Sequence, residues 1–263
     1  MKTIAKKSLG QNFLKDKDII EKIVNLTNIK DNSVIEIGPG TGNLTKFILK
    51  NKPKKFIVIE KDKNLALNLK KNFEDKIKII NDDILNINEK SLSNEKLIVF
   101  GNLPYNISTE ILCKWILNLD NEKFWFHELV LMFQKEVADR IISKFNSSKY
   151  GRLSILANWK LDVKKITDIK PNCFIPKPKI NSSLLVFSPK EKFFKIKNSK
   201  NLEKVTKIFF NHRRKMIKKP FNQLFHGNLD IIRKLNLDMN LRPQNLDFET
   251  YYKLTHEFEN LRG

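Results

Sequence analysis

The sequence predicts an α/β fold, with a doubly wound, mostly parallel sheet and a small all-helical C-terminal domain. Two observations predict it. Up to residue 160, short and almost wholly apolar segments alternate with segments of helical period, as in a parallel sheet that is buried on both faces. From residue 190 onward the periodic segments are helical only. We therefore expect one domain over 1–189 and a second over 190–263.

The first domain is predicted to begin with a helix and then to alternate strands with helices. An acidic start and apolar residues on one side predict the helix over 16–29. Continuous apolar runs predict strands over 33–38, 55–60, 76–82, 96–102 and 127–133. Helical period predicts helices over 43–51, 64–73, 107–119 and 134–145. We expect right-handed connections between the parallel strands.

The alternation ends after residue 160. Segments 161–169 and 182–189 predict two strands with no helix between them, which favours a hairpin that closes the sheet. The segment that connects them holds three prolines, which exclude a helix or a central strand there. In the second domain, the helical segments are 202–221, 229–236 and 248–261.

The composition is typical of a soluble globular protein. Of 263 residues, 41% are hydrophobic and 30% are charged. No apolar run approaches the roughly 20 residues of a membrane span, and the basic N-terminus lacks the apolar core of a signal peptide. We therefore expect a cytoplasmic protein with no membrane partner. Cys113 and Cys173 stand alone, so we expect neither a metal site nor a disulfide framework.

The formal net charge of +21 favours a polyanionic partner such as nucleic acid. The alternative is compositional drift, because only seven of the 50 basic residues are arginine. Drift adds lysine, but it does not readily account for the deficit of acidic residues. The basic character is strongest over 190–219, which holds 12 basic and two acidic residues.

Three glycines, Gly38, Gly40 and Gly42, mark the turn between the first predicted strand and the helix after it. Glycine allows a tight turn and lets a ligand approach the backbone. Glu60 ends the next strand, 22 residues after Gly38, where a carboxylate can hold both hydroxyls of a ribose. The glycines fall at positions one, three and five rather than one, three and six, which disfavours a nicotinamide dinucleotide.

Two aspartates, Asp82 and Asp83, end the third predicted strand. A carboxylate there can accept a hydrogen bond from the exocyclic amine of an adenine. The alternative is a cap or a turn, where aspartate is also common. Glycine, glutamate and aspartate at three successive strand ends favour a pocket for an adenosine that carries no pyrophosphate. S-adenosylmethionine fits this description.

Asn-Leu-Pro-Tyr, at 102–105, follows the fourth predicted strand at the same edge of the sheet. The N6 lone pair of adenine is delocalised into the ring, and hydrogen-bond acceptors around the N6–H groups release it. The Asn102 amide oxygen and the Leu103 carbonyl can be these acceptors, and Pro104 fixes the backbone between them and Tyr105. Tyr105 offers a flat face on which the base can stack. The alternative is an ordinary turn, in which these residue types are common.

At this point the sequence resembles a known family, the KsgA family of small-subunit rRNA adenine N6,N6-dimethyltransferases. Seven ordered motifs support the resemblance over nearly the whole chain: "KSLGQNFL" at 7–14, "EIGPGTGNLT" at 36–45, "GNLPYNIST" at 101–109, "QKEVADRI" at 134–141, "YGRLS" at 150–154, "FIPKPKINS" at 174–182 and "NHRRK" at 211–215. The resemblance implies a Rossmann-like, S-adenosylmethionine-dependent methyltransferase sheet over 1–189 and a helical, basic, RNA-binding domain over 190–263. It also implies S-adenosylmethionine as the cofactor, with S-adenosylhomocysteine as product and no metal.

The resemblance also implies roles for individual residues. The catalytic motif is Asn102, Leu103, Pro104 and Tyr105, and Phe174 stacks on the target base from the opposite side. A plain packing role is the alternative for Phe174. The cofactor contacts are Asn12, Leu14, Gly38, Gly40, Glu60, Asp82, Asp83 and Asn102. Which of the two aspartates makes the main adenine contact is open, because the family usually has a small residue after the first.

The partner that the resemblance implies is 16S rRNA within the small ribosomal subunit, where two adjacent adenosines of the 3′-terminal hairpin each receive two methyl groups. Residues Arg213, Arg214, Lys215 and Lys218, which we expect on one helix, can hold backbone phosphates. Three alternatives stay open: an Erm-type methyltransferase of large-subunit rRNA, a DNA adenine methyltransferase, and an assembly factor that acts mainly by binding. We expect a monomer.

Overall fold

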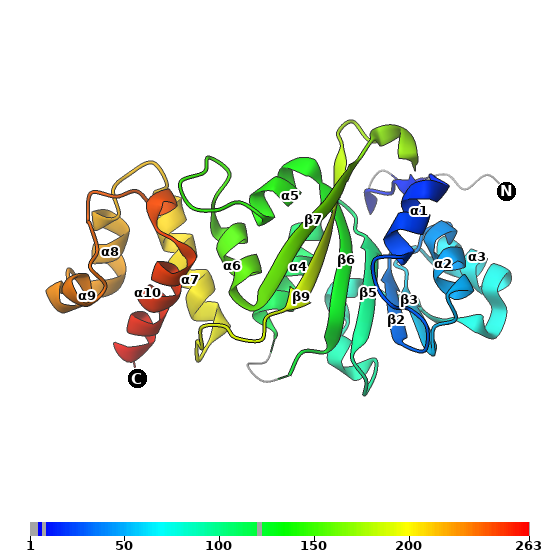
Figure 1. The fold of residues 1–263 in the computed structure, drawn as a ribbon, viewed down its shortest axis with the longest axis horizontal. Helices are drawn as coiled ribbons and strands as arrows, with labels where there is room; N and C mark the ends of the chain where they lie inside the picture. Colours follow the sequence, from blue (N-terminus) through cyan, green and yellow to red (C-terminus); the bar gives the residue numbers. More distant parts are fainter. Residues whose placement is uncertain (1–4, 7–8, 120–122, 263) are drawn as a thin grey trace. The chain divides into compact units, whose positions relative to one another are not determined.

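The computed structural model describes residues 5–6, 9–119 and 123–262, and the chain divides into two compact units (Figure 1). The first comprises Met1–Lys114, Glu122–Ala138 and Val163–Pro189. The second comprises Trp115–Asn121, Asp139–Asp162 and Lys190–Gly263. The boundary expected after residue 189 coincides with one limit of the second unit, which also takes in two earlier segments. The division into a catalytic and an RNA-binding domain stays a prediction.

A seven-stranded, mostly parallel sheet organises the fold, in the order β4-β3-β2-β5-β6-β9-β7. Its strands are β2 Ser33–Ile37, β3 Lys55–Ile59, β4 Lys78–Ile80, β5 Leu97–Asn102, β6 Phe126–Gln134, β7 Leu161–Ile169 and β9 Ser182–Pro189. The pairs β2–β3, β3–β4, β2–β5 and β5–β6 are parallel, and β6–β9 is antiparallel. The predicted α/β fold class is thus confirmed, and β9 and β7 are neighbours at the sheet edge, as the predicted hairpin requires.

The strand order reverses at the centre of the sheet. After β4 the chain returns to the other side of β2 and pairs there as β5, with Ile37 opposite Gly101. In open α/β sheets, ligands bind beyond the carboxyl ends of the strands at such a reversal. The carboxyl ends of β2 and β5 are therefore the expected place for the site.

Helix α1 Lys17–Val24 precedes the first strand of the sheet. The helices α2 Asn43–Lys50, α3 Lys63–Phe73, α4 Ser108–Leu117 and α5 Lys135–Ile141 lie between its strands. Figure 1 shows α1, α2 and α3 grouped around the half of the sheet formed by β2 and β3. Two short strands, β1 Phe13–Leu14 and β8 Phe174–Ile175, form a separate antiparallel pair. No helix formed by the described residues is long and apolar enough to cross a membrane.

Two helices predicted in the first part of the chain are too long, and one helix was missed. The helix predicted over 134–145 ends at Ile141, as α5. The helix predicted over 16–29 ends at Val24, because the chain turns there; Ile29 is nevertheless buried in the core, so its apolar side chain extended the pattern. Helix α6, Arg152–Lys160, was not predicted. Seven of its nine side chains are buried, and a helix buried nearly all round has no apolar face that periodicity could detect.

The second unit holds the remaining helices, α7 Ser199–Asn211, α8 Lys218–Phe225, α9 Leu229–Lys234 and α10 Phe248–Asn260. The single helix predicted over 202–221 is wrong, because the chain leaves the helix at His212 and α8 begins only at Lys218. Short-range bonds in this turn, such as Lys215 N to His212 O at 2.8 Å, replace helical ones. The residues Arg213, Arg214 and Lys215 therefore lie in a turn and do not share a helix with Lys218.

Candidate active site

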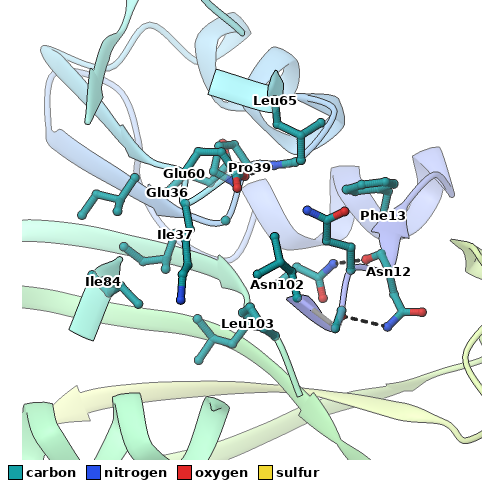
Figure 2. A pocket seen from close by; sticks show the side chains of 18 of the residues that line it. Asn12, Phe13, Glu36, Ile37, Pro39, Glu60, Leu65, Ile84, Asn102 and Leu103 are labelled. Carbon is teal, nitrogen blue, oxygen red and sulfur yellow. Dashed lines mark hydrogen bonds between the residues drawn. The ribbon is translucent and has the colours of Figure 1, made fainter. Parts of the chain in front are cut away.

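One pocket at the carboxyl ends of β2, β3, β4 and β5 brings together most of the predicted site residues, all of them in the first unit. The predicted residues that line it are Asn12, Leu14, Gly38, Gly40, Glu60, Asp82, Asp83, Asn102, Leu103, Pro104 and Tyr105. Figure 2 shows Glu60 and Glu36 along one part of this pocket and Asn102 beside Asn12 along another. The positions that sequence patterning placed at separate strand ends therefore share one cavity.

The glycine turn after β2 leaves room for a ligand at one glycine and not at another. Both Gly38 and Gly40 adopt positive φ, of 65° and 59°. A Cβ added to Gly38 would meet only the Asn102 carbonyl oxygen, at 3.8 Å, whereas one on Gly40 would lie 2.6 Å from the ring of Phe13. Gly38 therefore presents bare backbone to the pocket, and Gly40 is glycine because Phe13 packs against it.

Glu60 lies just beyond the end of β3 and holds the glycine turn in place. Its Oε2 accepts the N–H of Gly40 at 3.0 Å and its Oε1 accepts the N–H of Asp62 at 2.8 Å. Burial raises the pKa of Glu60 above its ordinary value, and these two hydrogen bonds offset the effect only in part. Each carboxylate oxygen accepts one backbone bond here and has a second lone pair, so both can still accept a ligand hydroxyl.

Glu36, the fourth of the five residues of β2, is a pocket residue that the sequence patterning did not single out. Its side chain is 2% exposed, and it accepts a hydrogen bond from Thr45 Oγ1 at 2.7 Å. Burial raises its pKa to about 8, with the nearby Glu60 adding to the shift. The only signal in the sequence was a carboxylate inside an otherwise apolar strand.

Glu36 makes the stability of the protein depend on pH. Between its ordinary pKa and about 8, the folded protein keeps the Glu36 proton and the unfolded chain loses it, so the free energy of unfolding falls as the pH rises through this window. We expect Glu36→Gln to flatten this dependence, as measured by urea unfolding at a series of pH values. A slope equal to that of the parent would show that Glu36 ionises normally.

The two aspartates after β4 are not equivalent. Both carboxylate oxygens of Asp83 already have partners within the protein. Oδ1 accepts a hydrogen bond from Leu85 N at 3.0 Å, and Oδ2 pairs with Lys61 Nζ at 2.6 Å. Burial alone would raise the Asp83 pKa, but the bonds from Lys61 and Leu85 outweigh it and the pKa is lowered. Asp82 is exposed, and its Oδ1 accepts Asp83 N at 2.6 Å. Asp82 is therefore the better placed of the two to contact a ligand.

The Asn-Leu-Pro-Tyr motif ends β5 at the pocket wall. Asn102 Nδ2 donates a hydrogen bond to the carbonyl oxygen of Asn12 at 2.6 Å, which leaves Oδ1 as the amide atom for a ligand (Figure 2). Leu103 is 1% exposed. The hydroxyl of Tyr105 lies 2.5 Å from Ser182 Oγ at the start of β9, which fixes the ring, and burial raises the pKa of this half-buried tyrosine.

The N-terminal segment (residues 9–14) forms part of the pocket wall. Asn43, which follows the third glycine of the turn, donates Nδ2 to the carbonyl oxygen of Leu14 at 2.7 Å. Gly10 has φ 62°, and a Cβ there would come within 2.9 Å of Asn106 Oδ1. Lys7 and Ser8, the first two residues of the N-terminal motif, lie outside the described residues.

Phe174 is the predicted catalytic residue that the structure does not bring to the pocket. It is 2% exposed, pairs with Leu14 across the β1–β8 ladder and belongs to the hydrophobic core. In this conformation it fits the alternative, a packing role. A stacking contact with a target base requires its ring to be uncovered, and that role stays a prediction.

The predicted RNA-binding residues lie in the second unit and differ in their surroundings. Arg213 is half-buried; its Nε donates to Gln244 Oε1 at 3.3 Å and its Nη2 donates to the carbonyl oxygen of Ser148. Arg214, Lys215 and Lys218 are exposed. Among the described residues, no group of three or more His, Cys, Asp or Glu side chains could hold a metal ion.

Comparisons with known proteins agree with this geometry. The family model for ribosomal RNA adenine dimethylase matches residues 3–260. A relative from Pelagibacter ubique (strain HTCC1062), named ribosomal RNA small subunit methyltransferase A, is 65% identical over 259 residues that cover 98% of each chain.

Two solved structures share the fold. A dimethyladenosine transferase from Plasmodium falciparum has a TM-score of 0.81 and 28% identity, covering 94% of this chain and 98% of that chain. The 23S rRNA methyltransferase ErmE has a TM-score of 0.68 and covers 94% of this chain and 100% of its own, but its 19% identity shows a likeness of fold alone. Together with the family match over 3–260, the pocket and its motif establish that the chain belongs to the ribosomal RNA adenine dimethylase family.

Proposed function

We propose that this protein transfers methyl groups from S-adenosylmethionine to N6 of two adjacent adenosines in the 3′-terminal hairpin of 16S rRNA in the small ribosomal subunit. Each adenosine becomes N6,N6-dimethyladenosine, and the modification contributes to ribosome biogenesis. The observation that supports the chemistry best is the Asn102 amide, whose Nδ2 is held by Asn12 O at 2.6 Å, so that its oxygen remains for a substrate amine.

The residues that line the pocket fit S-adenosylmethionine. Glu60 would accept the two ribose hydroxyls, because each of its oxygens has a lone pair beyond the backbone bond that it already accepts. Asp82 would accept the adenine amine, since Asp83 is occupied by Leu85 N and Lys61. The open face of Gly38 would lie against the methionine portion, with Asn12 and Leu14 closing the pocket.

For methyl transfer, the protein must make the unreactive N6 amine of adenine nucleophilic. When bound, S-adenosylmethionine supplies an electrophilic methyl group. Asn102 Oδ1 and the Leu103 carbonyl would accept the two N6–H bonds, which draws the nitrogen toward a tetrahedral geometry and frees its lone pair. Tyr105 would hold the base by stacking, with its hydroxyl anchored on Ser182. The new N6–methyl bond would form as the bond from the methyl group to the cofactor's sulfur breaks, which leaves S-adenosylhomocysteine. Positioning supplies most of the rate, and no general base is needed before attack, because the N6 proton becomes acidic and is lost to water only afterwards.

The relatives and the motif together favour the small subunit over the alternatives. The relative at 65% identity is named as a small-subunit methyltransferase, whereas the likeness to ErmE at 19% identity concerns the fold. An assembly factor acting by binding alone has no use for an oriented Asn102 amide, although binding and chemistry can coexist in one protein. Charge alone does not exclude DNA.

The test offers three substrates in parallel. Purified protein and S-adenosylmethionine with a labelled methyl group are incubated with undermethylated small subunits, with large-subunit rRNA and with duplex DNA. We expect label to enter the small subunits only. Preferential labelling of large-subunit rRNA would support the Erm-type alternative, and labelling of DNA without labelling of either RNA would refute an RNA substrate.

The exposed cations of the turn at 213–215 would contact RNA phosphates. We expect Arg214→Ala/Lys215→Ala to weaken binding to small subunits and to reduce the slope of log affinity against log salt by about 0.7–0.9 for each lost contact. Binding of S-adenosylmethionine should not change, because its pocket lies in the first unit.

The control for this variant is Lys70→Ala/Lys71→Ala, which removes the same charge from exposed positions at the end of α3 in the first unit. A parental salt slope in Arg214→Ala/Lys215→Ala would show that the turn does not touch RNA. Arg213 is left out of the pair because its guanidinium already bonds Gln244 and Ser148, so its loss would disturb the fold of the second unit.

A further inference from the structure

Asp62 lies two residues after Glu60 and makes contacts that the cofactor chemistry does not require. It is 5% exposed and does not line the pocket. Its Oδ1 accepts the N–H of Asn64 at 3.0 Å, at the beginning of α3. Its Oδ2 accepts hydrogen bonds from Gln11 Nε2 at 3.2 Å and Lys6 Nζ at 2.9 Å.

The N-terminal segment thereby connects Asp62 to Asn102. Lys6 N donates to Gln11 Oε1 at 2.7 Å, so the two residues that bind Asp62 are also bound to each other. The next residue along the chain, Asn12, offers its carbonyl oxygen to Asn102 Nδ2 at 2.6 Å, the bond drawn in Figure 2. Asp62 is therefore connected to the amide of Asn102 by two hydrogen bonds, with the side chain of Gln11 and the backbone of residues 11 and 12 between them.

We propose that Asp62 is a positioning residue for methyl transfer: it holds the N-terminal segment in place, and through the Asn12 carbonyl it fixes which face of the Asn102 amide meets the substrate. This inference rests on the proposed function. An amide presents an acceptor on one side and two donors on the other. If Asn12 moved away, the amide could turn and present Nδ2–H to the amine, which would repel it.

The charge of Asp62 suits this task. Burial tends to raise the Asp62 pKa, but hydrogen bonds from Lys6, Gln11 and Asn64 outweigh it, and the pKa lies below its ordinary value. The side chain is therefore ionised at neutral pH, and charge-assisted bonds are stronger than neutral ones. The Asp62 N–H also donates to Glu60 Oε1. Asp62 therefore contacts both the Glu60 carboxylate, which would bind the ribose of the cofactor, and the N-terminal segment.

The test is Asp62→Asn, in which the amide oxygen can still accept Asn64 N while NH2 replaces the oxygen that accepts from Gln11 and Lys6. We expect the single-turnover rate of methyl transfer, at saturating cofactor and small subunits, to fall about tenfold, because small displacements at a reacting centre are costly. Affinity for S-adenosylmethionine should change much less than the rate. Gln11→Ala removes the same bond from the other side and should lower the rate in the same way.

The decisive comparison repeats Asp62→Asn in an Asn102→Ala background. If Asp62 acts through Asn102, the double variant should be no slower than Asn102→Ala alone. A further tenfold loss in that background would overturn the inference, as would a parental rate in folded Asp62→Asn and Gln11→Ala. The control is Asp247→Asn, which alters a helix-capping aspartate that accepts Thr250 N at 2.8 Å in the second unit and should leave the rate unchanged.

The parental protein in the same assay separates this inference from the proposed function. No transfer to small subunits by the parent would refute the proposed function itself. Transfer by the parent with additive effects of Asp62 and Asn102 would refute only the positioning role of Asp62.

Discussion

Asn102→Ala is expected to lower the rate of methyl transfer at least about 100-fold, the loss typical of removing an oriented group that acts on the reacting atoms. The variant loses the amide oxygen that would accept an N6–H bond. It also loses the donor that binds Asn12 O at 2.6 Å. Single-turnover transfer of labelled methyl groups to undermethylated small subunits measures the rate, and calorimetry measures the cofactor affinity, which should change much less.

Two further variants make this prediction sharper. Asn102→Asp keeps an acceptor oxygen but has no N–H for the Asn12 carbonyl, so it should also be slow. Asn118→Ala is the matched control, because Asn118 is an exposed asparagine of the second unit. A near-normal rate of methyl transfer by Asn102→Ala would show that Asn102 has no catalytic role.

The second large effect concerns the cofactor. Glu60→Ala is expected to weaken S-adenosylmethionine binding by on the order of 100-fold or more, because two charge-assisted hydrogen bonds worth about 1.5–3 kcal/mol each would be lost. The glycine turn also loses the bond from Gly40 N to Glu60 Oε2 at 3.0 Å, so the loop itself becomes less ordered. Isothermal titration calorimetry measures the affinity of the parent and of Glu60→Ala for S-adenosylmethionine and for NAD.

The control for this variant is Glu95→Ala, which removes an exposed carboxylate in the first unit that pairs with Lys54. Its affinity for the cofactor should equal that of the parent. Unchanged binding by Glu60→Ala would mean that Glu60 only supports the turn. Tight binding of NAD by the parent would contradict the choice of cofactor.

Much of the fold and the site was predictable because the signals are local. Buried parallel strands are continuous apolar runs, and their carboxyl ends meet at one edge of a sheet. Gly38, Glu60, Asp82 and Asn102 could therefore be placed in one pocket from their positions after successive strands, and they do line the same pocket.

The features that could not be predicted depend on contacts between distant residues. The bond from Asn12 O to Asn102 joins positions 90 residues apart, and that from Gln11 to Asp62 joins positions 51 apart. The sequence of helix α6 shows no helical spacing of apolar residues, because the helix is buried nearly all round. The segment before the break at His212 contains neither proline nor glycine. The local signal is Pro220, eight residues further on, which is compatible with the first turn of α8 but not with the interior of one helix over 202–221.

The surroundings of ionisable side chains were also not predictable from the sequence. Glu36 lies in a segment that the sequence patterning treats as a continuous apolar run, and only its burial beside Thr45 and Glu60 shows that its pKa is raised to about 8. Arg213 looked equivalent to Arg214, yet its guanidinium bonds Gln244 and Ser148, whereas Arg214 is exposed. Residue type and spacing do not distinguish a structural arginine from a binding one.

The most direct test of the central proposal is to identify the modified nucleosides. Undermethylated small subunits are incubated with the protein and S-adenosylmethionine, and the 3′-terminal fragment of the 16S rRNA is digested and analysed by mass spectrometry. The proposal predicts N6,N6-dimethyladenosine at two adjacent positions of the hairpin, hence four methyl groups per particle, and none with Asn102→Ala. Methyl groups elsewhere in the rRNA, or an unmodified hairpin, would contradict it.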